Sequence, residues 1–305
     1  MSATFRPRRS VLFLPGGNAR ALSKAETLPA DVLVFDLEDA VTPENKESAR
    51  RMVASAIAER DYGERELIVR INGLDSRWAA GDIAAVVPLQ PDGLLVPKIS
   101  RAEDVRRVRA ALRAAGAETN VAIWAMMETP LAVLNAAAIA ATSRDSGAPL
   151  EGFVIGTNDL AAETEIRPGP DRAPMLSWLT TCLLAARAYG ISIVDGIYND
   201  FNNAAGFAAE CAQARMLGMD GKSLIHPNQV EVCNTTFTPT AEELAWAQSI
   251  LAAFDRPENA GKQVVAISGR TVERLHARLA RRMVATAHAA ERPPALAPPA
   301  AASEG

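Results

Sequence analysis

The sequence predicts an α/β fold, a (β/α)8 or TIM barrel, with a C-terminal helical appendage. Its 305 residues suit such a barrel, which needs roughly 250. Short runs rich in Val, Ile and Leu alternate with longer Ala-rich segments, a pattern typical of parallel strands joined by crossover helices. Eight runs of this kind occur, whereas an open doubly wound sheet more often stops at about five or six strands.

Each strand is expected where a short apolar run ends at a polar, Gly or Pro residue. The predicted strands are Val11–Pro15, Val32–Leu37, Leu67–Ile71, Gly93–Lys98, Val121–Met127, Gly152–Gly156, Ser192–Ile197 and Lys222–His226. The segments between them have helical character. Predicted helices are Pro43–Glu59, Arg101–Ala115, Pro130–Ala141, Ala173–Ala188 and Phe207–Leu217.

The chain divides into three parts. Residues 1–238 are expected to form the barrel. Residues 239–290 are expected to form the appendage, with a helix over Thr240–Phe254 and another that begins near Thr271. Residues 291–305 are rich in Ala and Pro, so they cannot bury a core and are expected to form a disordered tail.

Composition excludes several classes of protein. A hydrophobic share of 49% with 22% charged residues is ordinary for a soluble globular chain. The net charge of −4 gives no positive field for nucleic acid, and no apolar run is long enough to span a membrane. Cys182, Cys211 and Cys233 are too few and too far apart for a disulfide framework or a zinc site, so a cytoplasmic location is expected.

Polar residues follow most of the predicted strands. In a (β/α)8 barrel the catalytic groups lie at these C-terminal strand ends. The residues there are Asp36, Glu38, Asp39, Arg70, Asn72, Lys98, Glu128, Asn158, Asp159, Asp195 and His226. Several carboxylates with few His or Cys residues indicate a hard cation, Mg²⁺ or Mn²⁺, rather than zinc.

Glu128 and Asp159 are the expected metal ligands, because they follow neighbouring strands directly. Each residue alone has another explanation, since Asp and Thr side chains near such positions commonly cap the next helix. So many ionisable groups in one pocket would be costly without a ligand, which favours a functional site.

Arg70 and Lys98 are the expected cations of the site. Arg70 ends a strand, where its guanidinium can bind a substrate carboxylate or enolate oxygen in a bidentate contact. A structural salt bridge to Glu38 or Asp39 is the open alternative. Lys98 is expected to support substrate binding electrostatically, because neighbouring carboxylates keep it protonated, whereas an imine-forming lysine needs a lowered pKa.

Two further cations, Arg20 and Lys24, follow the first predicted strand one helical turn apart. They form a local basic cluster that suits the phosphates of a handle such as coenzyme A. A solvated helix face explains the same pair equally well. His226 is expected to hydrogen-bond a loop rather than to act as an acid or base.

Seven short strings at these strand ends resemble the citrate lyase β-subunit-like group of the HpcH/HpaI aldolase family. They are Leu14-Pro-Gly-Gly-Asn18, Val34-Phe-Asp-Leu-Glu-Asp-Ala-Val41, Val69-Arg-Ile-Asn72, Val96-Pro-Lys98, Met127-Glu-Thr-Pro130, Gly156-Thr-Asn-Asp-Leu160 and Gly221-Lys-Ser-Leu-Ile-His-Pro227. The resemblance runs in order from about Ser10 to Phe254. It implies a barrel assembled as a trimer or hexamer, magnesium on Glu128 and Asp159, Arg70 on the oxo or hydroxy acid, and coenzyme A near the first loop.

The resemblance also implies a reaction. Members of this group cleave malyl-, citramalyl- or citryl-thioesters into a 2-oxo acid or glyoxylate and an acyl thioester. Asp36, Glu38 or Asp39 would then position the water or group that carries protons. The alternatives are a magnesium-dependent hydroxyacyl-CoA thioesterase, a lyase for a carrier-bound citryl group, and a non-catalytic CoA-ester-binding barrel.

Two positions depart from the family pattern. Asn203 stands in a segment where many members have an acidic residue, and Ile267-Ser268-Gly269 stands where Leu-Asp-Gly is typical. The resemblance implies that the Asp of that string reaches the active site of a neighbouring subunit. The appendage around Ser268 is therefore expected not to supply an acid or base.

Overall fold

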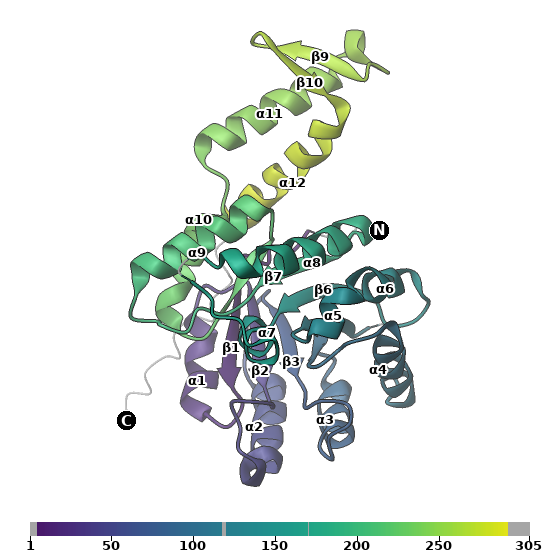
Figure 1. The fold of residues 1–305 in the computed structure, drawn as a ribbon, viewed down its shortest axis with the longest axis vertical. Helices are drawn as coiled ribbons and strands as arrows, with labels where there is room; N and C mark the ends of the chain where they lie inside the picture. Colours follow the sequence, from purple (N-terminus) through teal and green to yellow (C-terminus); the bar gives the residue numbers. More distant parts are fainter. Residues whose placement is uncertain (1–4, 118–119, 170, 292–305) are drawn as a thin grey trace, which may run out of the picture.

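A computed structural model describes residues 5–117, 120–169 and 171–291. Eight parallel strands form a closed barrel in sequence order, with helices around it (Figure 1). The strands are β1 Ser10–Pro15, β2 Val32–Asp36, β3 Glu66–Arg70, β4 Gly93–Val96, β5 Ala122–Met127, β6 Leu150–Ile155, β7 Ser192–Asp195 and β8 Gly221–Leu224. The predicted (β/α)8 barrel is confirmed, and each predicted strand end lies within two residues of the observed one.

The helices around the barrel are α1 Ala19–Lys24, α2 Lys46–Glu59, α3 Ala79–Val86, α4 Ala102–Ala114, α5 Pro130–Leu134, α6 Ala136–Ala141, α7 Thr157–Thr164, α8 Leu176–Tyr189, α9 Ala204–Leu217 and α10 Val230–Phe237. The single helix predicted over Pro130–Ala141 is wrong. It is divided at Asn135, whose side chain donates to the carbonyl of Ser100 and whose ψ of 9° is not helical. No described helix has the length and apolarity needed to cross a bilayer.

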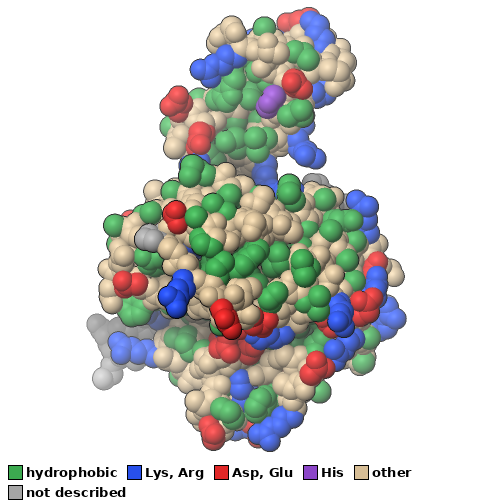
Figure 2. All heavy atoms as spheres, viewed as in Figure 1, with side chains coloured by type: hydrophobic (Ala, Val, Ile, Leu, Met, Phe, Trp, Pro, Cys, Tyr) green, Lys and Arg blue, Asp and Glu red, His purple; other side chains and the backbone are tan. Residues whose placement is uncertain are grey.

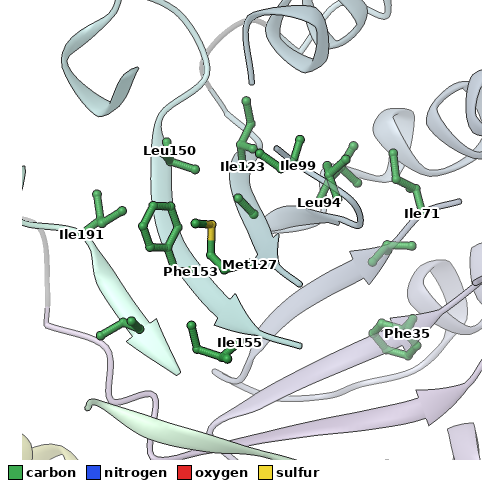
Figure 3. Packing of buried hydrophobic residues seen from close by; sticks show 14 of the residues in the cluster. Phe35, Ile71, Leu94, Ile99, Ile123, Met127, Leu150, Phe153, Ile155 and Ile191 are labelled. Atoms are coloured by element: carbon green, nitrogen blue, oxygen red, sulfur yellow. The ribbon is translucent and has the colours of Figure 1, made fainter. Parts of the chain in front are cut away.

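The core has two layers. Outward-facing strand residues such as Phe35, Ile123 and Phe153 pack beneath the helices (Figure 3). Inward-facing residues fill the barrel, with Trp124 as the largest. The guanidinium of Arg8 lies 4.6 Å from the centre of the Trp124 ring, at the end of the barrel where the strands begin. The barrel interior is therefore packed at that end.

The appendage consists of α11 Ala241–Asp255, the hairpin of β9 Val264–Ile267 and β10 Arg270–Glu273, and α12 Arg274–Glu291. It has a small apolar core of its own, and we propose residue 239 as its first residue. The helix predicted to begin near Thr271 is present as α12, but it begins at Arg274, because Thr271 pairs with Ala266 in the hairpin. All of the expected tail beyond Glu291 lies outside the described residues.

The hairpin turn contains Ser268 and Gly269, both with positive φ values, of 48° and 76°. Two-residue hairpin turns need such angles and favour Asn-Gly or Asp-Gly. Ser268 therefore occupies a turn position that also suits Asp, and the acidic side chain on this hairpin is Glu273 at the end of β10.

The appendage joins the barrel at the end where the strands begin. Arg282 of α12 forms an ion pair with Asp220, the residue before β8. Arg9, just before β1, donates to Thr238 at the start of the connection to α11 (2.8 Å). In Figure 1 the hairpin tip stands well away from the barrel.

Candidate active site

A cavity of about 400 Å³ lies at the C-terminal ends of the strands. One part of its wall is apolar and contains Phe13, Met126, Val154 and Ile197. The polar part contains Asp36, Asp39, Arg70, Thr157, Asp159 and Ser223. Figure 2 shows the molecule from one side, with acidic and basic side chains gathered together on the barrel below its centre.

Arg70 is held by Asp36 in a bidentate ion pair. Its Nε and Nη2 donate to the two carboxylate oxygens of Asp36 at 2.7 and 2.6 Å. Asp36 also accepts from the backbone N–H groups of Glu38 and Ala40. The structural salt bridge that the sequence left open therefore exists, but its main partner is Asp36 and not Glu38 or Asp39.

Nη1 of Arg70 has the weaker contacts of the guanidinium. It lies 2.8 Å from Oε2 of Glu38 and 3.4 Å from Oδ2 of Asp39. Burial alone would lower the pKa of Arg70, but the hydrogen bonds and charge of Asp36 raise it above its ordinary value. The guanidinium is therefore a permanent, fixed cation at the cavity wall.

Glu38 differs from the two aspartates beside it. Burial raises the pKa of the Glu38 carboxyl from 4.5 to about 8, against the opposing charge of Arg70. The side chain of Asp39 is 73% exposed, and both oxygens of Asp36 are occupied by Arg70. The pKa of Glu38 therefore lies near neutrality, where proton transfer is most effective.

The raised pKa of Glu38 predicts how stability depends on pH. The folded protein keeps the Glu38 proton up to about pH 8, while the unfolded chain loses it near 4.5. The contribution of Glu38 is therefore fully present below the unfolded pKa and is lost as pH rises through the folded one. Glu38→Gln should remove this fall, which has a slope of at most about 1.4 kcal/mol per pH unit.

Urea unfolding of wild type and Glu38→Gln at about pH 5, 6, 7 and 8, with a chelator present, measures this difference. The exposed Glu163 of α7 provides a control. The free energy of unfolding of Glu163→Gln, plotted against pH, should run parallel to that of wild type. A parallel curve for Glu38→Gln as well would show that Glu38 has an ordinary pKa in the folded protein.

Glu128 and Asp159 face one cation, the ammonium of Lys98. Nζ of Lys98 hydrogen-bonds Asp159 and lies 3.8 Å from Oε1 of Glu128. The backbone N–H of Lys98, which has a positive φ of 56°, donates to the same Glu128 oxygen at 2.7 Å. Burial raises the pKa of Glu128, and the charge of Lys98 opposes this shift.

Gly156 keeps Glu128 in this position. A Cβ atom on Gly156 would lie 2.3 Å from Cβ of Glu128, a separation that no side chain permits. A larger residue there would push Glu128 away from Lys98 and Asp159. The Gly-Thr-Asn-Asp string therefore has a steric reason for its glycine.

The residues present fit a divalent cation. Two carboxylates that converge on one ammonium have the charge and the oxygen atoms to hold Mg²⁺ or Mn²⁺. The described part of the chain contains no group of three or more His, Cys, Asp or Glu side chains placed to hold a metal. A cation here would take its remaining ligands from water and substrate, as Mg²⁺ commonly does.

Several other strand-end residues have structural partners. Asn72 donates to the Leu37 carbonyl and to Asp82. Asp195 is fully buried and accepts from Arg172 and Lys222, on the side of the barrel wall that α9 covers. These two residues therefore do not face the cavity.

The loop residues are also occupied. His226 accepts from the backbone of Asn228 and stacks on Phe201 with ring centres 4.8 Å apart, as a loop-binding histidine should. Asn158 and Asn199 exchange two side-chain hydrogen bonds. Asn203 caps α9 by accepting from the backbone N–H of Gly206, which explains a polar residue there without catalysis.

Arg20 and Lys24 lie on the exposed side of α1, and neither lines the cavity. The sequence prediction missed Phe13, Met126, Thr157 and Ser223, which line it. Three of them are inward-facing strand residues. No signal in the sequence marks their direction, because strands that are buried on both faces are mostly apolar on both.

Three comparisons relate the chain to known proteins. The family model described as HpcH/HpaI aldolase/citrate lyase matches residues 9–227. The chain is 46% identical over 289 residues to a (3S)-malyl-CoA thioesterase of Cereibacter sphaeroides, covering 95% of this chain and 98% of that protein. It is 37% identical over 273 residues to the citrate lyase subunit beta of Escherichia coli K12, covering 88% and 89%.

A solved structure is similar as well. It is the protein CitE from Mycobacterium tuberculosis in complex with magnesium, acetoacetate and coenzyme A, with 28% identity and a TM-score of 0.71. The match covers 92% of this chain and 98% of that one. It includes more than the barrel strands, because those end at Leu224.

Proposed function

Because the chain belongs to the HpcH/HpaI aldolase/citrate lyase family, we propose that it is a magnesium-dependent lyase that cleaves a carbon–carbon bond in a short hydroxyacyl-CoA thioester. Malyl-, citramalyl- and citryl-type thioesters are the substrate class. The products are a 2-oxo acid or glyoxylate and an acyl thioester. The main observation in support is that the carboxylates of Glu128 and Asp159 both face the ammonium of Lys98. They do so at the end of the barrel where Arg70 lines the cavity.

Glu128 and Asp159 would hold the cation. Bound there, Mg²⁺ would stabilise negative charge on oxygens of the acid fragment. Asp36 fixes the Arg70 guanidinium through Nε and Nη2, so a substrate carboxylate would accept from Nη1 in place of Glu38 and Asp39. Since Arg70 is held before substrate binds, its charge needs no reorganisation during the reaction.

Glu38 is the residue we assign to proton transfer. As a carboxylate it accepts the proton of the substrate hydroxyl, the bond between the two carbons breaks, and its electron pair forms the thioester enolate. Glu38 then returns the proton to the enolate carbon, so atoms and charge balance over the cycle. A pKa near 8 allows both forms at neutral pH, although a bound cation would lower it.

Thioester hydrolysis is the second candidate. It is favoured by the 46% identity to a (3S)-malyl-CoA thioesterase over nearly the full length of both proteins. The same residues would then bind the acyl group while Glu38 activates water. A non-catalytic CoA-ester-binding barrel, the third hypothesis, predicts binding without turnover.

A product assay decides among these. The protein is mixed with Mg²⁺ and malyl-, citramalyl- or citryl-CoA, and free CoA and oxo acid are measured separately. Oxo acid without free CoA supports the lyase, free CoA without oxo acid supports the thioesterase, and neither product with any ester would contradict both enzymes. Citryl linked to an acyl carrier protein is assayed in parallel, because citrate lyase subunit beta is a relative.

Further expectations belong to this proposal. Arg20 and Lys24 would contact phosphates of coenzyme A, from their exposed positions on α1. The protein would act as a trimer or hexamer in the cytoplasm, with the barrel ending at residue 238. Size-exclusion chromatography with light scattering measures the assembly directly.

Lys98 provides a prediction about the metal. Its ammonium and a divalent cation would compete for the same two carboxylates. Lys98→Met keeps much of the aliphatic stem but removes the competitor, so Mg²⁺ affinity measured by calorimetry should rise by roughly tenfold. Lys24→Met, on the exposed side of α1, should leave the affinity unchanged, and equal affinities for wild type and Lys98→Met would contradict the competition.

A further inference from the structure

Ser223 of β8 has a buried hydroxyl that no described group satisfies. The residue is 1% exposed, and within the described residues its Oγ has no hydrogen-bond partner. It also lines the cavity that contains Asp36 and Arg70. A buried hydroxyl without a partner destabilises the folded protein, so its presence needs an explanation.

The direction of the Ser223 side chain follows from its neighbours in β8. Lys222 points outward, because its ammonium binds Asp195 and Glu210 between the barrel and α9. Leu224 belongs to the outer layer of the core. Since residues alternate along a strand, Ser223 faces the barrel interior, where its partner in register is the apolar Val11.

The surroundings of Ser223 indicate the kind of ligand. The inward-facing side chains on neighbouring β1, Val11 and Phe13, cannot hydrogen-bond, and Arg70 lies over the Phe13 ring at 5.1 Å. A serine hydroxyl donates one hydrogen bond, and a carboxylate offers about four lone-pair sites. One carboxylate can therefore accept from a guanidinium and a hydroxyl together.

We infer that Ser223 is a substrate-binding residue whose hydroxyl donates to a carboxylate oxygen of the acid fragment. The guanidinium of Arg70 pairs with the negative charge of the same carboxylate. The inference rests on the proposed function, because it assumes that the cavity binds a short acid. It also assigns a role to the Gly-Lys-Ser string of β8, which contains neither a proposed metal ligand nor Arg70. Ser223 thereby selects for substrates that keep this carboxylate.

Ser223→Ala tests the inference, with Ser10→Ala as a matched control. Ser10 is also a buried strand serine, but its Oγ accepts from the backbone N–H of Asp31 at 3.0 Å. Glyoxylate and pyruvate affinities are measured by calorimetry with Mg²⁺, and stability is measured by urea unfolding. Steady-state kinetics with the active ester then separate KM from kcat.

Ser223→Ala should weaken oxo-acid binding about tenfold, the effect of one hydrogen bond to a charged group, and raise KM more than it lowers kcat. Its urea midpoint should equal or exceed that of wild type, since an unsatisfied hydroxyl has been removed. Ser10→Ala should show the reverse, a lower midpoint with unchanged affinity.

Two results would overturn the inference. One is an oxo-acid affinity that is the same in Ser223→Ala as in wild type. The other is a urea midpoint that falls in Ser223→Ala as it does in Ser10→Ala. Either would show that the Ser223 hydroxyl has a structural role. If wild type binds neither oxo acid in the presence of Mg²⁺, the proposed function fails together with the inference. The two failures are therefore distinguished by the wild-type titration alone.

Discussion

Glu128→Gln should lower kcat/KM by roughly a thousandfold, because it removes a charged ligand from the proposed metal position and with it the stabilisation of developing negative charge. The side chain remains nearly isosteric, so it can still accept the Lys98 backbone N–H that Glu128 binds at 2.7 Å. Asp159→Asn should act in the same direction. Calorimetry with Mg²⁺ and steady-state kinetics with the active ester measure both effects.

Glu163→Gln is the matched control, because Glu163 is exposed and lies one helical turn after Asp159 in α7. It should retain the magnesium affinity and turnover of wild type. Unchanged affinity in both Glu128→Gln and Asp159→Asn would refute the metal site. A loss of thermal stability in Glu128→Gln would instead attribute the loss of activity to misfolding.

Arg70→Met should abolish activity and also destabilise the protein by about 3–5 kcal/mol, because Asp36 is left buried without its counter-charge. Asp36 is 2% exposed and both of its oxygens bind Arg70. Arg70→Lys keeps a charge but cannot form the bidentate pair. It should lie between wild type and Arg70→Met in both measurements.

The double variant Arg70→Met/Asp36→Asn separates the structural role from the catalytic one. Asn keeps an oxygen for the backbone N–H groups that Asp36 accepts but carries no charge to bury. Urea unfolding should show stability recovered in part, while turnover stays absent. Near wild-type turnover in the double variant would mean that Arg70 acts only through its ion pair.

The strands were predictable because each is a short apolar run that ends at a polar residue or at Gly or Pro. Glu128 and Asp159 were predictable as a pair for the same reason, since they follow β5 and β6, which pair in the barrel. The hairpin of the appendage was not predicted. Its strands are only four residues long, and Arg-Thr-Val-Glu has little of the apolar alternation that marks a strand.

The direction of strand-end side chains was the main point that the sequence could not supply. Asp36 and Asp195 both end apolar strands, yet Asp36 lines the cavity and Asp195 binds Lys222 beside α9. Strands of a (β/α)8 barrel are buried on both faces, so they lack the alternation of apolar and polar residues that would indicate which side faces inward. Asp36 is the partner of Arg70 because the two residues lie opposite each other in the register of β2 and β3.

The attachment of the appendage near Asp220 and Thr238 has a geometric consequence for assembly. Because it emerges from the rim opposite the cavity, the hairpin cannot cover the cavity of its own chain. Any contact between a hairpin and a cavity must therefore join two copies, either reciprocally across a two-fold axis or head-to-tail. Head-to-tail contacts either close into a ring or continue as a filament, so every cavity receives a hairpin from another subunit only if the assembly is closed.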